Sequence, residues 1–155
     1  MISPEILRHY PLFHSFTDVQ LRSIAMIAEE EQVNAGVALF FKGQPADHLY
    51  IFKDGCIDLY YMMGDNHVGE TEKGLPVGEI NPGEMFSISA LIEPHVLSST
   101  AIASKPSAVI KIEAQKLQML FEKDKKLAYL LTYQAAKASI ERLHNTHIQL
   151  AAAWA

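Results

Sequence analysis

One segment of the chain, residues 82–103, gathers side chains that could hold a small anion. It reads PGEMFSISALIEPHVLSSTAIA and begins with a turn defined by Pro82 and Gly83. Its hydroxyl groups are those of Ser87, Ser89, Ser98, Ser99 and Thr100. Hydroxyls and backbone N–H groups are suitable donors to phosphate or carboxylate oxygens. No lysine or arginine occurs between Lys73 and Lys105, so this segment contains no cation of its own for such an anion.

Histidines are the other candidates for chemistry. His95 lies inside the same segment, where it is either an ordinary loop residue or a cation when protonated. His144 and His147 are three residues apart and would share a helix face, but the sequence offers no third ligand, so we expect no metal site. We also expect no enzyme activity and no resident cofactor, because no nucleophile elbow, phosphate-binding loop or dinucleotide glycine motif occurs.

The composition is that of an ordinary globular protein. The chain has 155 residues, enough for a single domain, with 49% apolar and 20% charged residues. No apolar run approaches the roughly 18 residues of a membrane-spanning helix, and no signal-peptide pattern is visible. The single cysteine, Cys56, excludes an internal disulfide framework. We therefore expect a cytoplasmic protein with no membrane partner.

Charge is distributed unevenly along the chain. Residues 1–113 carry 7 Lys/Arg against 15 Asp/Glu, whereas residues 114–155 carry 6 against 3. The net charge of −5 argues against direct DNA binding. The basic C-terminal part is either a solvated helix face or a surface that steers a protein partner.

Hydrophobic patterns predict helices in residues 1–30, a β-roll in 31–113 and helices in 114–155. A short helix is expected at residues 3–13, and a capping box of Thr17 and Gln20 begins a second one. Strand-like runs occupy residues 37–41, 48–52, 56–63, 77–80, 96–103 and 108–113. The Asp54-Gly55 pair predicts a hairpin, Lys105-Pro106-Ser107 a strand break, and residues 64–76 a mobile loop.

The last helix carries apolar residues at heptad spacing. They are Tyr129, Tyr133, Ala136, Ile140, Leu143, His147, Leu150 and Trp154, spaced alternately four and three residues apart. Such a seam packs on the protein's own sheet or pairs with a second copy of the helix. We expect both, at different ends, and thus a homodimer whose seam comprises Tyr133, Ala136, Ile140, Leu143, His147 and Leu150.

The order of these elements resembles the cyclic nucleotide-binding domain, as found in catabolite activator and FNR regulators and in the regulatory subunit of cAMP-dependent protein kinase. The resemblance is carried by Gly36, Lys42-Gly43 with Asp47, the Tyr50–Gly55 strand and turn, and Pro82-Gly83-Glu84-Met85-Phe86. It implies an α+β fold: an eight-stranded β jelly-roll barrel flanked by N-terminal helices and a long C-terminal dimerisation helix.

The resemblance also implies a site in this segment. The cassette-equivalent residues are Gly83, Glu84, Phe86, Ser87, Ile88, Ser89, Ala90, Leu97, Ser98, Ser99 and Thr100. In the family, a glutamate accepts from the ribose hydroxyl and an arginine pairs with the cyclic phosphate. Ile88 and Leu97 stand at these two positions, and Ser87 stands at that of a glycine.

The sequence therefore predicts a regulatory or sensor domain that does not bind cAMP or cGMP by the usual cassette chemistry. Two alternatives remain: a different small ligand in the same pocket, or a homodimeric protein-interaction scaffold with a filled, ligand-free pocket. A regulatory protein is a possible partner in either case. The chain also resembles stand-alone bacterial members of the family in Ser89-Ala90-Leu91, Glu93-Pro94, and Arg142-Leu143 with Thr146.

Overall fold

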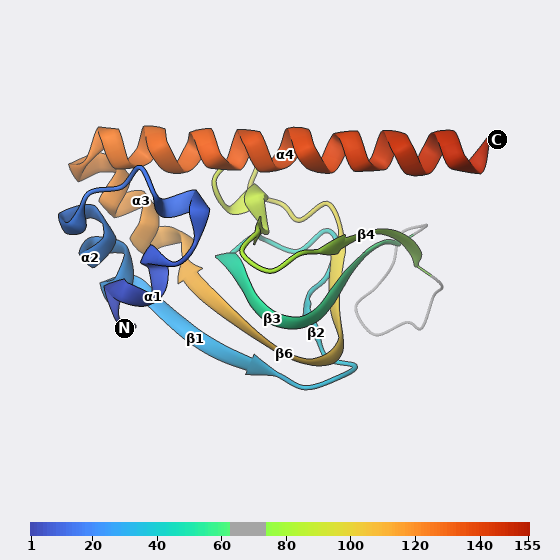
Figure 1. Cartoon of the computed structure of the whole chain (residues 1–155), viewed down its shortest axis with the longest axis horizontal. Helices are drawn as coiled ribbons and strands as arrows, with labels where there is room; N and C mark the ends of the chain where they lie inside the picture. The colour runs from blue at the N-terminus through green and yellow to red at the C-terminus, as the bar shows by residue number, and fades with distance from the viewer. Residues whose placement is uncertain (63–73) are drawn as a thin grey trace.

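A long C-terminal helix lies across one side of an antiparallel sheet. The computed structural model describes residues 1–62 and 74–155, so most of the loop predicted at 64–76 lies outside the described residues. The elements are α1 (Pro4–Arg8), the 3-10 helix η1 (Pro11–Phe13), α2 (Asp18–Ile27), β1 (Ala28–Val33), β2 (Ala38–Phe40), β3 (His48–Tyr61), β4 (Leu75–Ile80), β5 (Met85–Phe86), the 3-10 helix η2 (Ile88–Ala90), β6 (Thr100–Glu113), α3 (Ala114–Lys123) and α4 (Lys125–Ala153). Helices α1, α2 and α3 gather at one end of the sheet, while α4 runs the length of the molecule (Figure 1).

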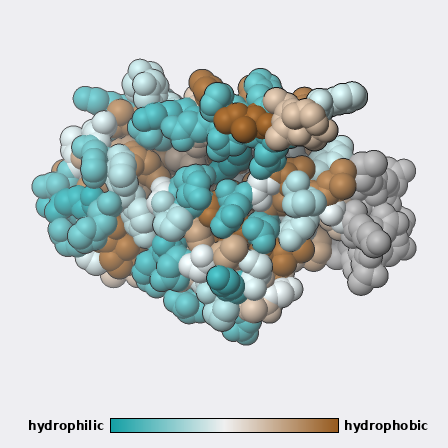
Figure 2. All heavy atoms as spheres, turned by 45° about the vertical axis from the view of Figure 1, so that its right-hand side comes forward, coloured by the Kyte–Doolittle hydropathy of each residue, from teal (hydrophilic) through white to brown (hydrophobic). Residues whose placement is uncertain are grey.

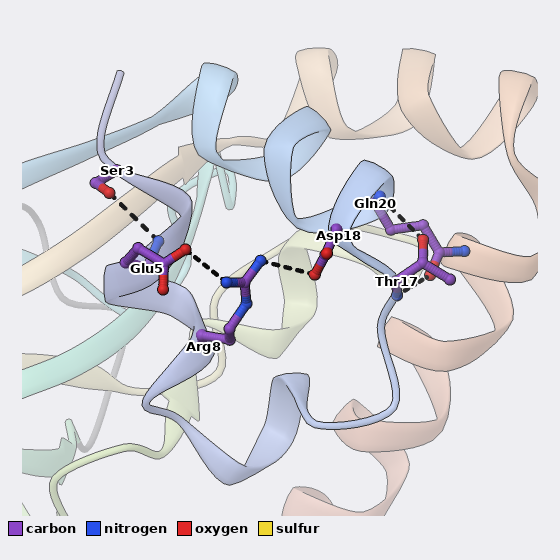
Figure 3. A network of polar contacts seen from close by, with 6 residues as sticks. All are labelled: Ser3, Glu5, Arg8, Thr17, Asp18 and Gln20. Carbon is purple, nitrogen blue, oxygen red and sulfur yellow. Dashed lines mark hydrogen bonds and ion pairs between the residues drawn. The ribbon is translucent and has the colours of Figure 1, made fainter.

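The predicted capping box at the start of α2 is confirmed. The hydroxyl of Thr17 accepts the backbone N–H of Gln20 at 3.2 Å, and the side chain of Gln20 accepts the N–H of Thr17 at 2.9 Å (Figure 3). Arg8 then joins α1 to α2 by donating to Asp18 at 2.7 Å. The single helix predicted at 3–13 is wrong: α1 ends at Arg8, and Pro11 starts η1 after an extended residue, as expected before a proline.

Strand β1 lies partly in the region where helix was predicted. Its sequence, AEEEQV, has poor strand propensity, but its register against β6 buries Ala28 and Val33. The glutamates between them find lysines: Lys53 contacts Glu30 at 2.9 Å, and Lys111 contacts Glu31 at 3.1 Å. Cross-strand partners therefore outweigh local propensity here.

The described residues form six strands rather than the expected eight. All pairings are antiparallel and follow the path β1-β6-β3-β4, with β2 on β6 and β5 on β3. The hairpin predicted at Asp54-Gly55 is wrong, because β3 continues through it with register shifts between Phe52 and Ile57. A Cβ on Gly55 would lie 2.6 Å from the Cα of Ser107, so the glycine permits close approach at a bulge.

Strand β6 likewise continues through the predicted break at Pro106. In its pairing with β3, Cys56 faces Lys105 and Asp54 faces Ala108, which leaves Pro106 and Ser107 in the bulge. Ser107 compensates with its side chain, which accepts the N–H of Cys56 at 3.0 Å and donates to the carbonyl of Lys105 at 2.8 Å. Proline and glycine thus bend these two strands without ending them.

One face of α4 anchors the helix to the body of the protein. Leu127, Leu131 and Ala135 are buried, and the N-terminus is capped by Asp124, whose carboxylate accepts the N–H of Leu127 at 3.0 Å. The same carboxylate accepts from Gln20 of α2 at 3.3 Å. No helix among the described residues combines the length and apolar character needed to cross a membrane.

Candidate ligand-binding site

A cavity of about 300 Å³ lies between the segment after β5 and the middle of α4. Its lining combines apolar side chains, hydroxyls and one charge: Phe40, Leu59, Phe86, Ser87, Ile88, Ser89, Ile92, Leu97, Ser98, Ser99, Ser139 and Arg142. Figure 1 shows η2 and the adjoining loop directly beneath α4. The volume is at the lower end of the range of about 300–1,000 Å³ typical of small-molecule sites.

Strand β5 positions the first wall of the cavity, which is formed by lining residues between Phe86 and Ser99. Phe86 pairs with Tyr50 of β3, and Ser87 then turns the chain with a φ of 59°, in the left-handed region. That conformation costs an L-residue about 1–2 kcal/mol, which glycine would avoid. The hydroxyl of Ser87 donates to the carbonyl of His48 at 2.7 Å, and this bond helps to hold the turn.

An aromatic cluster supports this wall. The rings of Tyr50 and Phe86 are stacked at 5.1 Å, and Phe40 lies 5.8 Å from Tyr50 and 6.1 Å from Phe86. Burial, followed by the nearby carboxylates of Glu31 and Asp47, raises the pKa of Tyr50 to about 12. The phenol of Tyr50 is therefore neutral, and the aromatic cluster that supports this wall carries no charge.

The resemblance to the family predicts that Ile88 and Leu97 stand where the family has its glutamate and arginine. Both line the cavity, Leu97 as a buried residue and Ile88 as a half-buried one, and a volume of about 300 Å³ remains beside them. This wall of the cavity is thus apolar at both positions.

The structure brings most, but not all, of the predicted site residues to the cavity. Phe86, Ser87, Ile88, Ser89, Leu97, Ser98 and Ser99 line it. Gly83 and Glu84 line a neighbouring groove against α4, Ala90 is buried in the core, and the buried hydroxyl of Thr100 accepts the N–H of Lys42 at 2.9 Å. His95 makes a contact within the same loop: its Nδ1 lies 3.1 Å from the carbonyl oxygen of Ser89. The ring nitrogen is the donor in this contact, because a carbonyl oxygen can only accept.

Five lining residues were not predicted as site residues, namely Phe40, Leu59, Ile92, Ser139 and Arg142, and Arg142 of α4 is the charged one. Its Nη2 donates to the carbonyl of Met85 at 2.6 Å and lies 3.6 Å from a carboxylate oxygen of Glu84. Burial lowers the pKa of this guanidinium from its usual value, and the charge of Glu84 opposes that effect. The usable signal was periodicity, since Arg142 continues the inward stripe of Leu127, Leu131, Ala135 and Ala138.

The opposite face of α4 carries the predicted seam. Tyr133, Ala136, Ile140, Leu143, His147 and Leu150 are all exposed. Ile140, with 68% of its surface exposed, is the most open of the large apolar seam residues between Tyr133 and Leu150. Apolar side chains are visible along the upper edge of Figure 2, where α4 runs.

A single group of metal-ligand side chains occurs within the two described ranges. Cys56 Sγ lies 3.7 Å from Glu79 and 3.9 Å from Asp58. These three residues could offer one sulfur and two carboxylate ligands. The same distances suit weak S–H donation to the carboxylates, so the geometry does not require an ion.

The fold and the cavity together define an α+β structure with a ligand-sized space between its antiparallel sheet and a long C-terminal helix. The sequence matches the cyclic nucleotide-binding domain family over residues 30–124, and the chain belongs to this family. Comparison of the sequence with curated proteins gives no match.

Solved structures agree with the family assignment. A crystal structure from Geobacter metallireducens GS-15, described as a candidate cyclic nucleotide-binding protein, is 35% identical with a TM-score of 0.80, covering 93% of this chain and 100% of that one. A cyclic nucleotide-binding-like protein from Brucella abortus is 34% identical with a TM-score of 0.61, covering 77% and 97%. The sensor domain of the transcriptional regulator DNR from Pseudomonas aeruginosa shares the fold at 18% identity, with a TM-score of 0.69 and 90% coverage of each chain.

Proposed function

We propose that this protein is a non-enzymatic regulatory domain that senses a small ligand in the cavity beneath α4. The observation that carries the proposal is the remaining volume of about 300 Å³, lined by residues of the cassette-equivalent segment and of α4. A domain with a filled pocket would use Ile88 and Leu97 to occupy that space. Their position along the wall favours the ligand-binding alternative over the ligand-free scaffold.

Cyclic AMP and cyclic GMP are poor candidates for this ligand. Ile88 cannot accept a hydrogen bond from a ribose hydroxyl, and Leu97 cannot pair with a cyclic phosphate. Each lost hydrogen bond to a charged group removes roughly 1.5–3 kcal/mol. The ligand is therefore one that gains from apolar contacts on this wall.

In this proposal the domain forms a homodimer through α4, and the ligand regulates the interface of that dimer. The exposed seam and the heptad spacing support parallel pairing with a second copy, and a regulatory protein could bind the same face. Because the inner face of α4 borders the cavity, ligand binding would change the population of α4 arrangements and hence the interface.

We propose that strands β3 and β6 each act as two strands of a jelly roll, divided at the register shifts near Asp54 and Pro106.

We also propose a cytoplasmic location. It fits the single free cysteine, Cys56, which a reducing compartment would keep as a thiol.

Mass spectrometry of small molecules that copurify with the native protein tests the proposal. We expect one bound compound in stoichiometric amount, released on denaturation. Calorimetry of the stripped protein should show no binding of cyclic AMP or cyclic GMP at micromolar concentration. Micromolar binding of cyclic AMP would contradict the conclusion that Ile88 and Leu97 exclude cyclic nucleotides. If no compound copurifies, and if an extract of cellular small molecules does not raise the thermal midpoint of the protein, the scaffold alternative is favoured.

A further inference from the structure

The cavity contains a cation that does not come from the cassette-equivalent segment. Among the described residues, Arg142 is the one charged side chain in its lining. It comes from α4, whereas Ile88 and Leu97 come from the segment after β5. Its side chain is 27% exposed and lines both this cavity and the neighbouring groove beside Val77 and Ile148, so it is only partly removed from water.

We propose that Arg142 is the anion-binding group of the site and that the ligand is a small organic anion with an apolar body. The inference rests on the proposed function and adds to it the chemical class of the ligand. One end of such a molecule would pair with the guanidinium. The rest would lie against the apolar wall.

The rest of the lining fits this class of ligand. Six of its members are apolar: Phe40, Leu59, Phe86, Ile88, Ile92 and Leu97. The hydroxyls of Ser89, Ser98, Ser99 and Ser139 are additional polar groups. A single arginine beside an apolar surface favours an amphipathic anion over a neutral molecule, which would leave the charge without a ligand partner, and over a highly charged one.

Arg142 retains donors for such a ligand. Its contacts with Glu84 and Met85 both run through Nη2, whereas a guanidinium carries five N–H donors in a planar fork. The fork suits two parallel bonds to a carboxylate or phosphate group.

Glu84 is the partner with which a ligand anion would compete for Arg142. Its carboxylate is 3.6 Å from Nη2, longer than a direct hydrogen bond, and its side chain is 32% exposed. A pair of this kind stabilises weakly. A ligand anion can therefore displace Glu84 and shift the position of Arg142 on α4.

Calorimetry with a matched pair of probes, 4-phenylbutyrate and 4-phenylbutanol, tests the proposal on the full chain stripped of copurified compounds. The two probes share an apolar body and differ in charge. We expect the wild type to bind the carboxylate at least about tenfold more tightly than the alcohol. Arg142→Gln should abolish that preference while changing binding of the alcohol less than about twofold. Phenyl phosphate in the same assay distinguishes a phosphate preference from a carboxylate preference.

Three further variants make the result specific. Arg22→Gln removes the same charge from an exposed site on α2 and should leave the preference intact. Arg142→Lys should retain part of it, because the charge remains and the fork is lost. Glu84→Gln should tighten carboxylate binding by about two- to fivefold, because the competing charge is gone. The last two variants carry the test if Arg142→Gln does not fold.

The outcomes separate this inference from the proposed function. If Arg142→Gln folds and keeps the preference for the carboxylate, or if the wild type binds both probes equally, the role of Arg142 is overturned and the cavity remains a ligand site. If the wild type binds no probe and no compound copurifies with it, both proposals fail.

Discussion

The two walls of the cavity differ in what each can offer a ligand. The wall after β5 supplies a tight turn, hydroxyls and apolar side chains, among them Ile88 and Leu97. The wall formed by α4 supplies Arg142, the one charge lining the cavity in the described parts of the chain. The shape of the site therefore comes from one region and its charge from another.

This difference has a consequence for regulation. A cation on a rigid strand or turn would hold a ligand without moving an interface. Arg142 lies on the inner face of α4, and its neighbour Leu143 lies exposed on the seam. In the proposed homodimer, binding at one face of this helix would therefore act directly on the residues of the seam.

Ile140→Glu tests the seam and has the largest expected effect. A glutamate at the centre of a helix pair would be buried without a partner, so we expect the dimer dissociation constant to rise by more than about a hundredfold. Size-exclusion chromatography with light scattering should then show a monomer at concentrations where the wild type is a dimer.

Ile148→Glu is the matched control for that variant. Ile148 is the same residue type on the same helix and is 55% exposed, but it borders β4 in a shallow groove with Val77 and Gly78. It should leave the dimer unchanged. A dimeric Ile140→Glu protein, or a monomeric wild type, would remove α4 as the interface.

Introducing charged side chains into the first wall is expected to change the affinity for cyclic AMP by a smaller factor than Ile140→Glu changes the affinity of the dimer. The double variant Ile88→Glu, Leu97→Arg introduces the glutamate and the arginine that the family resemblance predicts for these two positions. If the segment keeps the backbone form of a cassette, cyclic AMP should bind at least about tenfold more tightly than to the wild type, as measured by calorimetry.

The control for this variant is Ile88→Gln, Leu97→Met, which changes the same positions without adding charge. It should not gain affinity for cyclic AMP. Leu97 is buried, so the thermal midpoint of each variant must first show that it folds. A folded double-charge variant that gains nothing would mean that this wall differs from a cassette in geometry as well as in charge.

Local signals predicted those parts of the fold that depend on neighbours in sequence. The capping box of Thr17 and Gln20 is such a case, because both partners lie within one helical turn. Strand β1 is the opposite case, because its glutamates are stabilised by Lys53 and Lys111 from other strands. The Asp54-Gly55 pair is compatible with a hairpin or a bulge, and only the close approach of Ser107 favours the bulge.

The same distinction holds within the site. The segment from Phe86 to Ser99 could be selected from sequence because its turn and hydroxyls are contiguous. Arg142 could not be selected in this way, because it comes from a helix more than forty residues further along. Thr100 was selected with its neighbours, yet its hydroxyl caps Lys42, a contact that depends on how β6 meets the β2 region.

The anchoring of α4 to α2 gives the smallest expected effect. The N–H of Leu127 is the main cause that lowers the pKa of the Asp124 carboxyl below its ordinary value of 3.8, with Gln20 and Lys126 adding to it. The ionised group therefore contributes stability that is complete above about pH 4 and is lost as pH falls through the lowered pKa.

At pH 7, Asp124→Ala should melt below the wild type, whereas Asp124→Asn should remain close to it because asparagine also caps helices. Thermal melts between pH 7 and pH 2.5 check the sign, since the wild type should lose stability relative to the non-titrating Asp124→Asn variant only at the acid end. A constant difference across that range would show that the Asp124 charge does not help to hold α4 over the cavity.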